Sequence, residues 1–365
     1  MKTKLYFLIA LLGIASWTAC TKDEETEQVP VVKMNIEDSP INGKVNESIL
    51  FSAFNVNNKA YEQEWKLDGL VKSNAADYDF TPLAAGIYNI EYTASNSAGV
   101  FSYKYVVNVG IPTVPSGPGS NSYVTKVFEF LPGPGQYTNK TLGSMEGAKS
   151  LEGQEGAVSL GAWGGYIVFG FDHTVINESQ KEDIIIYANA QFNWAEPGVV
   201  WVMQDANANG KPDDTWYELK GSEFGKEGYI RNYEVTYTKP AAGGHVSWKD
   251  NKGNTGVVSI SGTGVQAFPN WISGNEYTLK GSLLPSTEIK PGSLITSFPF
   301  AWGYADNAVG GDKFDIANAI DADGKAVSLS GIDFIKLQTG IQANLGILGE
   351  LSTEIMGVAD LSLVK

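Results

Sequence analysis

Hydrophobic and polar positions alternate along this chain in short runs, the pattern of half-buried β-strands. The first group of runs is Ile49–Phe54, Glu64–Leu67, Tyr88–Thr93 and Tyr103–Val107. The second group is Tyr166–Phe171, Asp183–Ala188, Val199–Met203, Thr215–Leu219, Arg231–Thr238, Val257–Ser261, Tyr277–Lys280 and Phe334–Gln338. No long apolar stripe with a 3.6-residue period accompanies them, so we expect neither crossover helices nor a parallel α/β sheet. The sequence predicts an all-β protein.

The length of 365 residues indicates two domains, at about 100–200 residues each. Turn residues separate the first group of strands, which predicts a small β-domain over residues 30–110. Residues 111–122 are rich in Pro, Gly and Ser and predict a semi-extended linker. Residues 123–365 then predict a larger antiparallel β-sandwich of jelly-roll type with long loops.

The first 29 residues are expected to direct and anchor the chain rather than to fold. A basic start is followed by the apolar run Leu5–Ile14, which is too short to span a bilayer as a helix. Ser16–Cys20 then resembles a lipobox, which implies a signal peptide over 1–19 and acylation of Cys20, the only cysteine. The alternative is an ordinary signal peptide with a chance cysteine. Residues 20–29 form an acidic tether, in which Lys22–Glu25 resembles the surface-export signal of Bacteroidetes lipoproteins.

Charge narrows the range of partners. Lys and Arg number 26 against 41 Asp and Glu, which gives a formal net charge of −15. Such an acidic chain is not expected to bind a nucleic-acid backbone, which requires clustered cations. The charge is compatible with cations or neutral ligands. A single cysteine excludes an intramolecular disulfide framework, and two histidines leave little room for a histidine-based zinc site.

Residues 30–110 resemble the PKD-like branch of the immunoglobulin sandwiches. The resemblance rests on Ala85–Tyr88 followed by Thr93–Gly99. The usual turn of that family is present only in part, as Trp65–Gly69. Trp65 is expected to be a core residue, as in other Ig-like domains. Domains of this kind space or present another domain, and we assign no chemistry to this one.

The C-terminal part resembles a group of Bacteroidetes surface lipoproteins. The matching segments are Gly164–Asp172, Trp216–Glu223, Arg231–Tyr237, Gly331–Lys336 and Gly349–Glu354. The resemblance implies a place in loci for TonB-dependent uptake, including vitamin B12 loci. It therefore implies an outer-membrane protein that faces the cell exterior and passes a small ligand to a TonB-dependent transporter. A corrinoid is the ligand we expect first and a glycan second.

One loop has the spacing of a calcium site. Residues 205–214 place oxygen side chains at positions 1, 3, 5 and 9 and a glycine at position 6, as in an EF-hand loop. The expected ligands are Asp205, Asn207, Asn209, Asp213 and the backbone carbonyl of Lys211. The bidentate Glu of position 12 is missing, since Trp216 stands there. The alternative is a polar hairpin loop without an ion.

Aromatic residues in loop-like surroundings are the candidates for ligand contact. Stacking on a flat ligand costs such side chains little conformational entropy. We expect the binding surface to be formed by Trp163, Trp194, Trp271, Trp302 and Tyr304. Each of them has a core role as its alternative, because a sandwich needs aromatic side chains inside.

Signals of catalysis are sparse, and we expect no enzyme. The chain has no G-x-S-x-G, no H-E-x-x-H and no glycine-rich phosphate loop. Glu350 and Glu354 have the chemistry of a glycosidase pair, but such pairs are common in a chain with 41 acidic residues. Asp306 lies on a loop without metal-like spacing. A glycan-active or glycan-binding protein is the main alternative function, and an adhesin or structural surface protein is the second.

Overall fold

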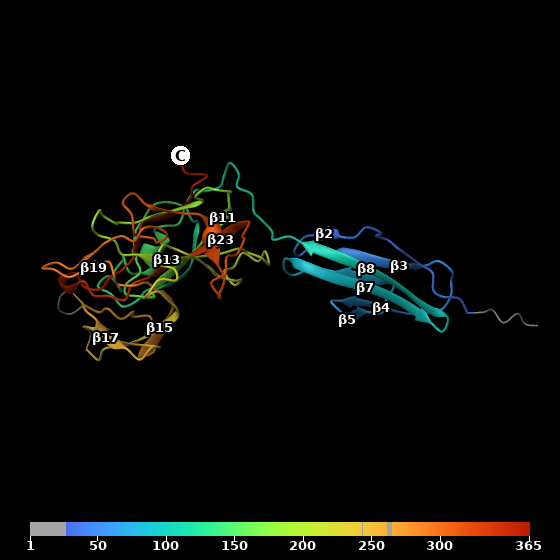
Figure 1. Ribbon diagram of the computed structural model, residues 1–365, viewed down its shortest axis with the longest axis horizontal. Coiled ribbons are helices and arrows are strands. Elements are labelled where there is room, and N and C mark those ends of the chain that lie inside the picture. Colours follow the sequence, from blue (N-terminus) through green and yellow to red (C-terminus); the bar gives the residue numbers. More distant parts are fainter. Residues whose placement is uncertain (1–26, 243, 261–264) are drawn as a thin grey trace, which may run out of the picture. The chain divides into compact units, whose positions relative to one another are not determined.

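The structure is a computed structural model that describes residues 27–242, 244–260 and 265–365 (Figure 1). The chain forms two compact units. The smaller contains the described residues up to 41 together with 49–80 and 88–107, and the larger contains 42–48, 81–87 and 108–365. The described residues contain no helix with the length and hydropathy that a membrane crossing needs. The predicted signal peptide and Cys20 lie outside the described residues.

The smaller unit is built on two sheets. One has the order β1 (Val32–Met34), β3 (Ile49–Asn55) and β6 (Asp77–Phe80). The other has the order β2 (Ile41–Gly43), β8 (Gly99–Val109), β7 (Gly86–Asn96), β4 (Glu62–Leu67) and β5 (Leu70–Ser73). These strands include all four runs that the sequence predicted for this part of the chain. Strands β2, β7 and β8 extend by two residues each beyond the bounds of the smaller unit given above.

Trp65 on β4 is at the centre of this unit. Its side chain is fully buried, and its ring centroid lies 5.8 Å from that of Phe51 and 4.7 Å from that of Tyr92. The indole Nε1 donates a hydrogen bond of 3.1 Å to the backbone oxygen of Ala75. A buried indole N–H needs such an acceptor. The predicted core role of Trp65 is confirmed.

A six-stranded sheet forms the frame of the larger unit. Its order is β22 (Ala319–Ile320), β14 (Tyr217–Leu219), β13 (Gly198–Met203), β23 (Gly331–Thr339), β11 (Tyr166–Ile176) and β9 (Lys126–Leu131). All five neighbouring pairs are antiparallel. The central strands β13 and β23 are buried along almost their whole length. Both faces of the sheet are therefore covered.

A three-stranded antiparallel sheet packs on this frame. It consists of β21 (Asp312–Phe314), β12 (Ile184–Tyr187) and β25 (Gly357–Asp360). Side chains of both sheets, such as Phe169, Ile335 and Ile186, meet in one fully buried apolar core. Burying each such side chain stabilises the fold by about 1.5–3 kcal/mol. The all-β prediction and the two-sheet sandwich are confirmed.

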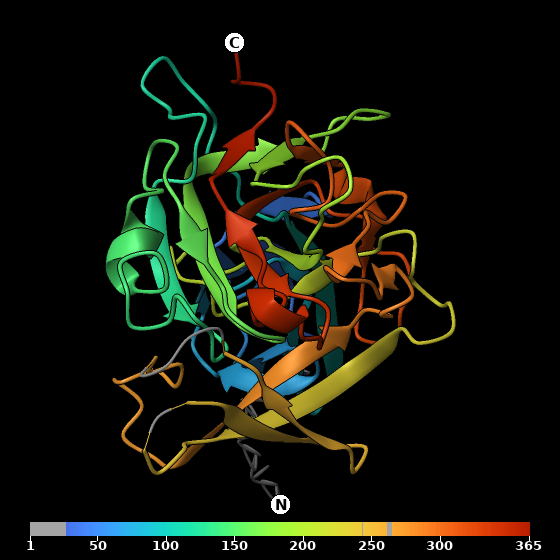
Figure 2. The ribbon, with the colours of Figure 1, turned by 90° about the vertical axis from the view of Figure 1, so that its left-hand side faces the viewer.

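A further antiparallel sheet covers a second core. It has the order β17 (Thr255–Val258), β16 (Val246–Asp250), β15 (Ile230–Thr238) and β18 (Glu276–Leu283), and it is the yellow and orange layer of Figure 2. Trp163 packs against its inner face, with its ring centroid 4.7 Å from that of Tyr233. The sequence predicted β15, β17 and β18, but it did not predict β16 or that these strands form a separate layer.

Short elements and long loops complete the larger unit. They are β10 (Val158–Ser159) paired with β24 (Glu354–Ile355), β19 (Ile289–Lys290) paired with β20 (Thr296–Ser297), the single helix turn α1 (Met145–Lys149), and the 3₁₀ turns η1 (Ile316–Asn318) and η2 (Gly346–Leu348). The candidate site is built mainly from these parts.

Candidate functional site

A pocket of about 380 Å³ on the larger unit gathers aromatic, amide and carboxyl side chains. We call it the acidic pocket. Its lining residues are Gln136, Tyr137, Leu142, Asn189, Gln191, Trp194, Glu196, Leu294, Leu345, Leu348, Glu350, Ser352 and Glu354. Its volume is in the lower part of the range of about 300–1,000 Å³ for small-molecule sites. A larger hollow of about 630 Å³ on the smaller unit is lined by Tyr61 and polar side chains, without a comparable group of buried carboxyls.

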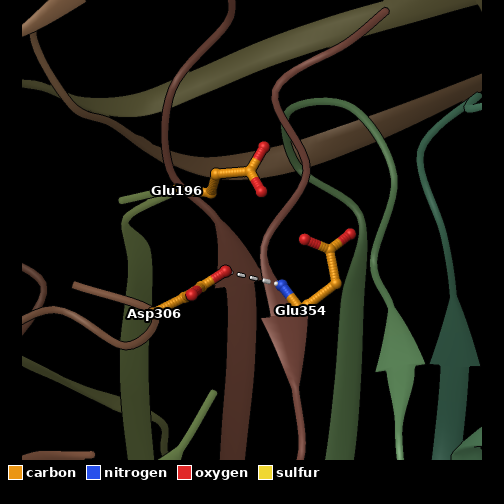
Figure 3. Close-up of side chains that lie close together, drawn as sticks. All are labelled: Glu196, Asp306 and Glu354. Atoms are coloured by element: carbon orange, nitrogen blue, oxygen red, sulfur yellow. Dashed lines mark hydrogen bonds between the residues drawn. The ribbon is translucent and has the colours of Figure 1, made fainter. Parts of the chain in front are cut away.

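Three buried carboxyl groups meet beside the acidic pocket, and Figure 3 shows them. Glu196 and Glu354 line the pocket, whereas Asp306, which is 0% exposed, does not. Glu196 precedes β13, Asp306 lies on the loop before β21, and Glu354 begins β24. One oxygen from each lies within 4.8 Å of the others. We call these residues the carboxyl triad. Their exposed fractions are 8%, 0% and 9%.

Backbone hydrogen bonds fix the triad in place. The amide of Glu354 donates to Oδ2 of Asp306 at 2.9 Å, and the amide of Glu196 donates to the backbone oxygen of Asp306 at 2.9 Å. Asp306 has φ of 55°, a left-handed conformation that Asp tolerates better than most residues. The Ser352 amide donates to Oε1 of Glu196 at 3.2 Å. The three carboxyl groups are thus held together by the fold.

Burial and mutual repulsion dominate the electrostatics of the triad. Burial raises the pKa of Glu196 well above its usual value, and the neighbouring Glu354 raises it further. The same two causes raise the pKa of Asp306, and burial also raises the pKa of Glu354. Within the described residues, no Lys, Arg or His forms an ion pair with any of the three. The triad therefore holds bound protons or needs a cation from outside the chain.

Glu350 adds a fourth carboxyl group to the wall of the pocket. Its Oε1 accepts a hydrogen bond of 2.8 Å from the amide of Gln136, while its Oε2 is buried without a partner. Burial raises the pKa of Glu350 to about 7. Oε2 thus lacks a donor among the described residues, and when protonated this carboxyl group can itself donate a hydrogen bond.

The rim of the pocket is apolar. Trp194 is half-buried there and Tyr137 is 37% exposed. The lining residue Leu294 is 44% exposed, and Phe192 and Ile347, close in sequence to lining residues, are 84% and 76% exposed. Apolar side chains at a rim with a polar floor are typical of sites for small organic ligands.

The other aromatic candidates lie elsewhere. Trp163 and Tyr304 are 0% and 1% exposed and pack in separate cores of the larger unit. Trp271 and Trp302 are each 47% exposed but do not line the acidic pocket. Of the five predicted ligand-contacting residues, the pocket includes Trp194 alone. The ligand role of each remains a prediction.

The predicted calcium loop closes on itself through hydrogen bonds. The amides of Asn209 and Gly210 donate to the two carboxylate oxygens of Asp205, at 3.0 and 2.8 Å. The Asn209 side chain donates to Asp213, and this bond lowers the pKa of Asp213. The side chain of Asn207 also donates to Asp213, at 3.2 Å. Calcium binding by these residues and by the carbonyl of Lys211 stays a prediction.

Sequence reasoning missed the carboxyl triad. Its members come from three segments more than 40 residues apart, so no local spacing indicates them. The one available signal was the pair Glu350 and Glu354, which could not be distinguished from the many other acidic pairs of the chain.

Comparisons with known proteins give little further information. No protein-family model and no curated protein matches the sequence. Among solved structures, the chain is similar to fibronectin(III)-like modules of Clostridium thermocellum CbhA, with 15% identity, a TM-score of 0.21, and coverage of 63% of this chain and 93% of that chain. Carbohydrate-binding modules of the β-sandwich superfamily match with 12% identity, a TM-score of 0.18, and coverage of 92% and 99%. A SusE-like protein matches with 9% identity, a TM-score of 0.19, and coverage of 89% and 97%. At such TM-scores these likenesses carry no argument about function.

Proposed function

We propose that this chain is a surface-displayed binding protein that captures a small nutrient in the acidic pocket without transforming it. The observation that carries the proposal is the composition of the pocket. An aromatic and aliphatic rim surrounds a floor of carboxyl and carboxamide groups. This arrangement suits a neutral or cationic ligand with one apolar face and edges that form hydrogen bonds.

The polar floor favours a glycan. Sugar hydroxyls donate hydrogen bonds to carboxyl oxygens such as those of Glu350, and they also accept from the carboxamides of Gln136 and Asn189. The apolar face of a sugar ring stacks on an aromatic side chain, for which Trp194 is the best placed of the lining residues. The volume of about 380 Å³ suits a short segment of such a ligand.

The apolar rim favours a corrinoid as the second candidate. The lining residue Leu294 is 44% exposed and adds apolar surface to that of Trp194 and Tyr137. A corrinoid presents methyl-bearing faces to such a rim and primary amides to the floor. It is too large for the pocket to enclose, so it would cover the opening and the rim together. The resemblance to lipoproteins of uptake loci also supports this ligand.

A binding experiment with a matched control tests the proposal. The purified chain is titrated with a panel of glycans and with cyanocobalamin, and heat and tryptophan fluorescence are followed. We expect Trp194→Ala to weaken binding at least about tenfold, because it removes the aromatic face on which the ligand would stack. Trp271→Ala, which removes an exposed tryptophan outside the pocket, should leave binding unchanged. Loss of binding in the Trp271 variant alone would refute the acidic pocket as the site.

The same titrations address catalysis and the choice of ligand. Products released from any bound glycan would show that the chain is an enzyme, and the carboxyl groups of the pocket would be the first to substitute. Binding of cyanocobalamin without binding of any glycan would establish the second candidate. The lipid anchor on Cys20, the outward-facing location and delivery to a TonB-dependent transporter complete the proposal, and they rest on sequence resemblance.

A further inference from the structure

We propose that the carboxyl triad of Glu196, Asp306 and Glu354 binds one calcium ion beside the acidic pocket, which Glu196 and Glu354 line. This site is separate from the predicted loop at Asp205. It does not depend on which organic ligand the pocket takes.

The spacing of the triad suits a single ion. Calcium binds oxygen atoms at about 2.3–2.6 Å, so two ligand atoms on opposite sides of one ion lie roughly 4.6–5.2 Å apart. One oxygen from each member of the triad lies within 4.8 Å of the others. All three atoms can therefore reach a common centre with little movement of the side chains.

Charge supplies the driving force. Three carboxyl groups are more than nine-tenths buried and have no basic partner within the described residues. Buried carboxylates are costly unless a counter-charge or a proton compensates them. A divalent cation compensates two negative charges at one point, and it would turn the repulsion within the triad into attraction.

An independent carboxyl group of the same pocket also lacks a partner. Glu350 is 3% exposed and lines the pocket beside Glu196 and Glu354, yet its Oε2 has no hydrogen-bond partner. Nearly all buried polar atoms in folded proteins have one, so an orphaned oxygen needs an explanation. Within the triad itself, Oδ1 of Asp306 is likewise buried without a hydrogen-bond partner, and an ion bound to the triad would satisfy it.

The donor set favours calcium over other metals. Among the described residues, the cluster that could hold an ion offers only carboxylate oxygens. It contains no His or Cys, the ligands that transition metals prefer. Ser352 and Asn189 lie within hydrogen-bonding reach of Glu354 and can contribute further oxygens. Calcium accepts six to eight oxygens in irregular geometry, whereas magnesium demands a near-ideal octahedron. The pocket leaves room for water or ligand oxygens at the remaining positions.

The test separates this site from the predicted loop. Asp205→Ala first removes the loop as a source of calcium binding in the full chain. We expect this variant to bind one calcium by calorimetry and to melt about 5–10 °C higher at a calcium concentration of 100 times Kd than in chelator. Adding Glu196→Gln or Glu354→Gln should abolish both effects.

A second measurement guards against misfolding. In chelator, Glu196→Gln should melt at the same temperature as its parent or higher, because the neutral Gln is close in shape to the protonated Glu and cannot become charged. Two results would overturn the proposal. The first is that the Asp205→Ala protein binds no calcium at a calcium concentration of about 10 mM. The second is that calcium binding is fully retained after both Gln substitutions. In the first case the triad is a group of carboxyls that share protons.

Discussion

The buried histidine His173 on β11 provides the most exacting test of the structure. Its side chain is fully buried, and both ring nitrogens face carboxylates. Nδ1 lies 2.7 Å from an oxygen of Asp172, and Nε2 lies 2.8 Å from an oxygen of Asp360 on β25. This arrangement links the six-stranded sheet to the three-stranded sheet. Both ring nitrogens can donate a hydrogen bond to a carboxylate only when the imidazole is protonated.

Replacing His173 by Gln should destabilise the larger unit by about 2–4 kcal/mol. Removing one partner of a buried ion pair costs roughly 3–5 kcal/mol, because the other charge stays buried without compensation. Asp360 is 3% exposed and would be left in that state. Gln keeps one donor, and the side chain of Asp172 is 36% exposed and can turn to water, so we expect a loss about 1 kcal/mol smaller than that range.

The loss should depend on pH in a defined direction. The hydrogen bond to Asp360 raises the pKa of His173 against the opposing effect of burial, and Asp172 raises it further. A group whose pKa is raised in the folded state contributes its full stabilisation of that state when the pH is below the pKa of the unfolded state, which is about 6.5 for His. That contribution is lost as the pH rises through the folded value. Hence His173→Gln should lower the free energy of unfolding most near pH 6 and less at alkaline pH.

Denaturant and thermal unfolding across pH 5.5–9 measure both effects. For a unit of this size, 2–4 kcal/mol corresponds to a decrease in melting temperature of roughly 5–15 °C. His245→Gln is the matched control, since His245 is exposed and contacts the backbone amide of Ile260. Equal and pH-independent losses in the two variants would refute the assigned role of the charged His173.

Three further predictions concern single residues. Trp163→Ala should destabilise the larger unit by about 3–5 kcal/mol in a denaturant titration, because it leaves a cavity beside the four-stranded sheet. An unchanged midpoint would show that Trp163 is not a core residue. Asp205→Ala should remove one calcium from the stoichiometry measured by calorimetry, and an unchanged stoichiometry would reduce the loop to a turn. Cys20→Ala should move the protein from the detergent phase to the aqueous phase in a phase-partition assay, since acyl chains provide the membrane affinity, and retention in the detergent phase would contradict the lipid anchor.

The sequence predicted the strands well because their signal is local. The run Arg231–Thr238 lies within β15, and Tyr166–Phe171 begins β11. Alternation of apolar and polar residues follows directly from the two faces of a strand, so it needs no knowledge of the partner.

The site could not be predicted in the same way, because it depends on distant segments. Trp163 stands beside glycines and was expected in a loop on the surface. The loop is there, with Gly164 at φ of 82°, but it turns the indole inward beneath β15. The triad likewise exists only because three distant segments converge, and no local pattern encodes that convergence.

The bond between the amide of Gln136 and Glu350 joins residues 214 positions apart. Contacts of such long range form late, because the entropy of closing the intervening chain must be overcome before they contribute. The acidic pocket is therefore a reporter of complete folding. A partly folded chain can contain most of its strands while lacking the pocket entirely, so ligand or ion affinity should appear later than β-structure during refolding.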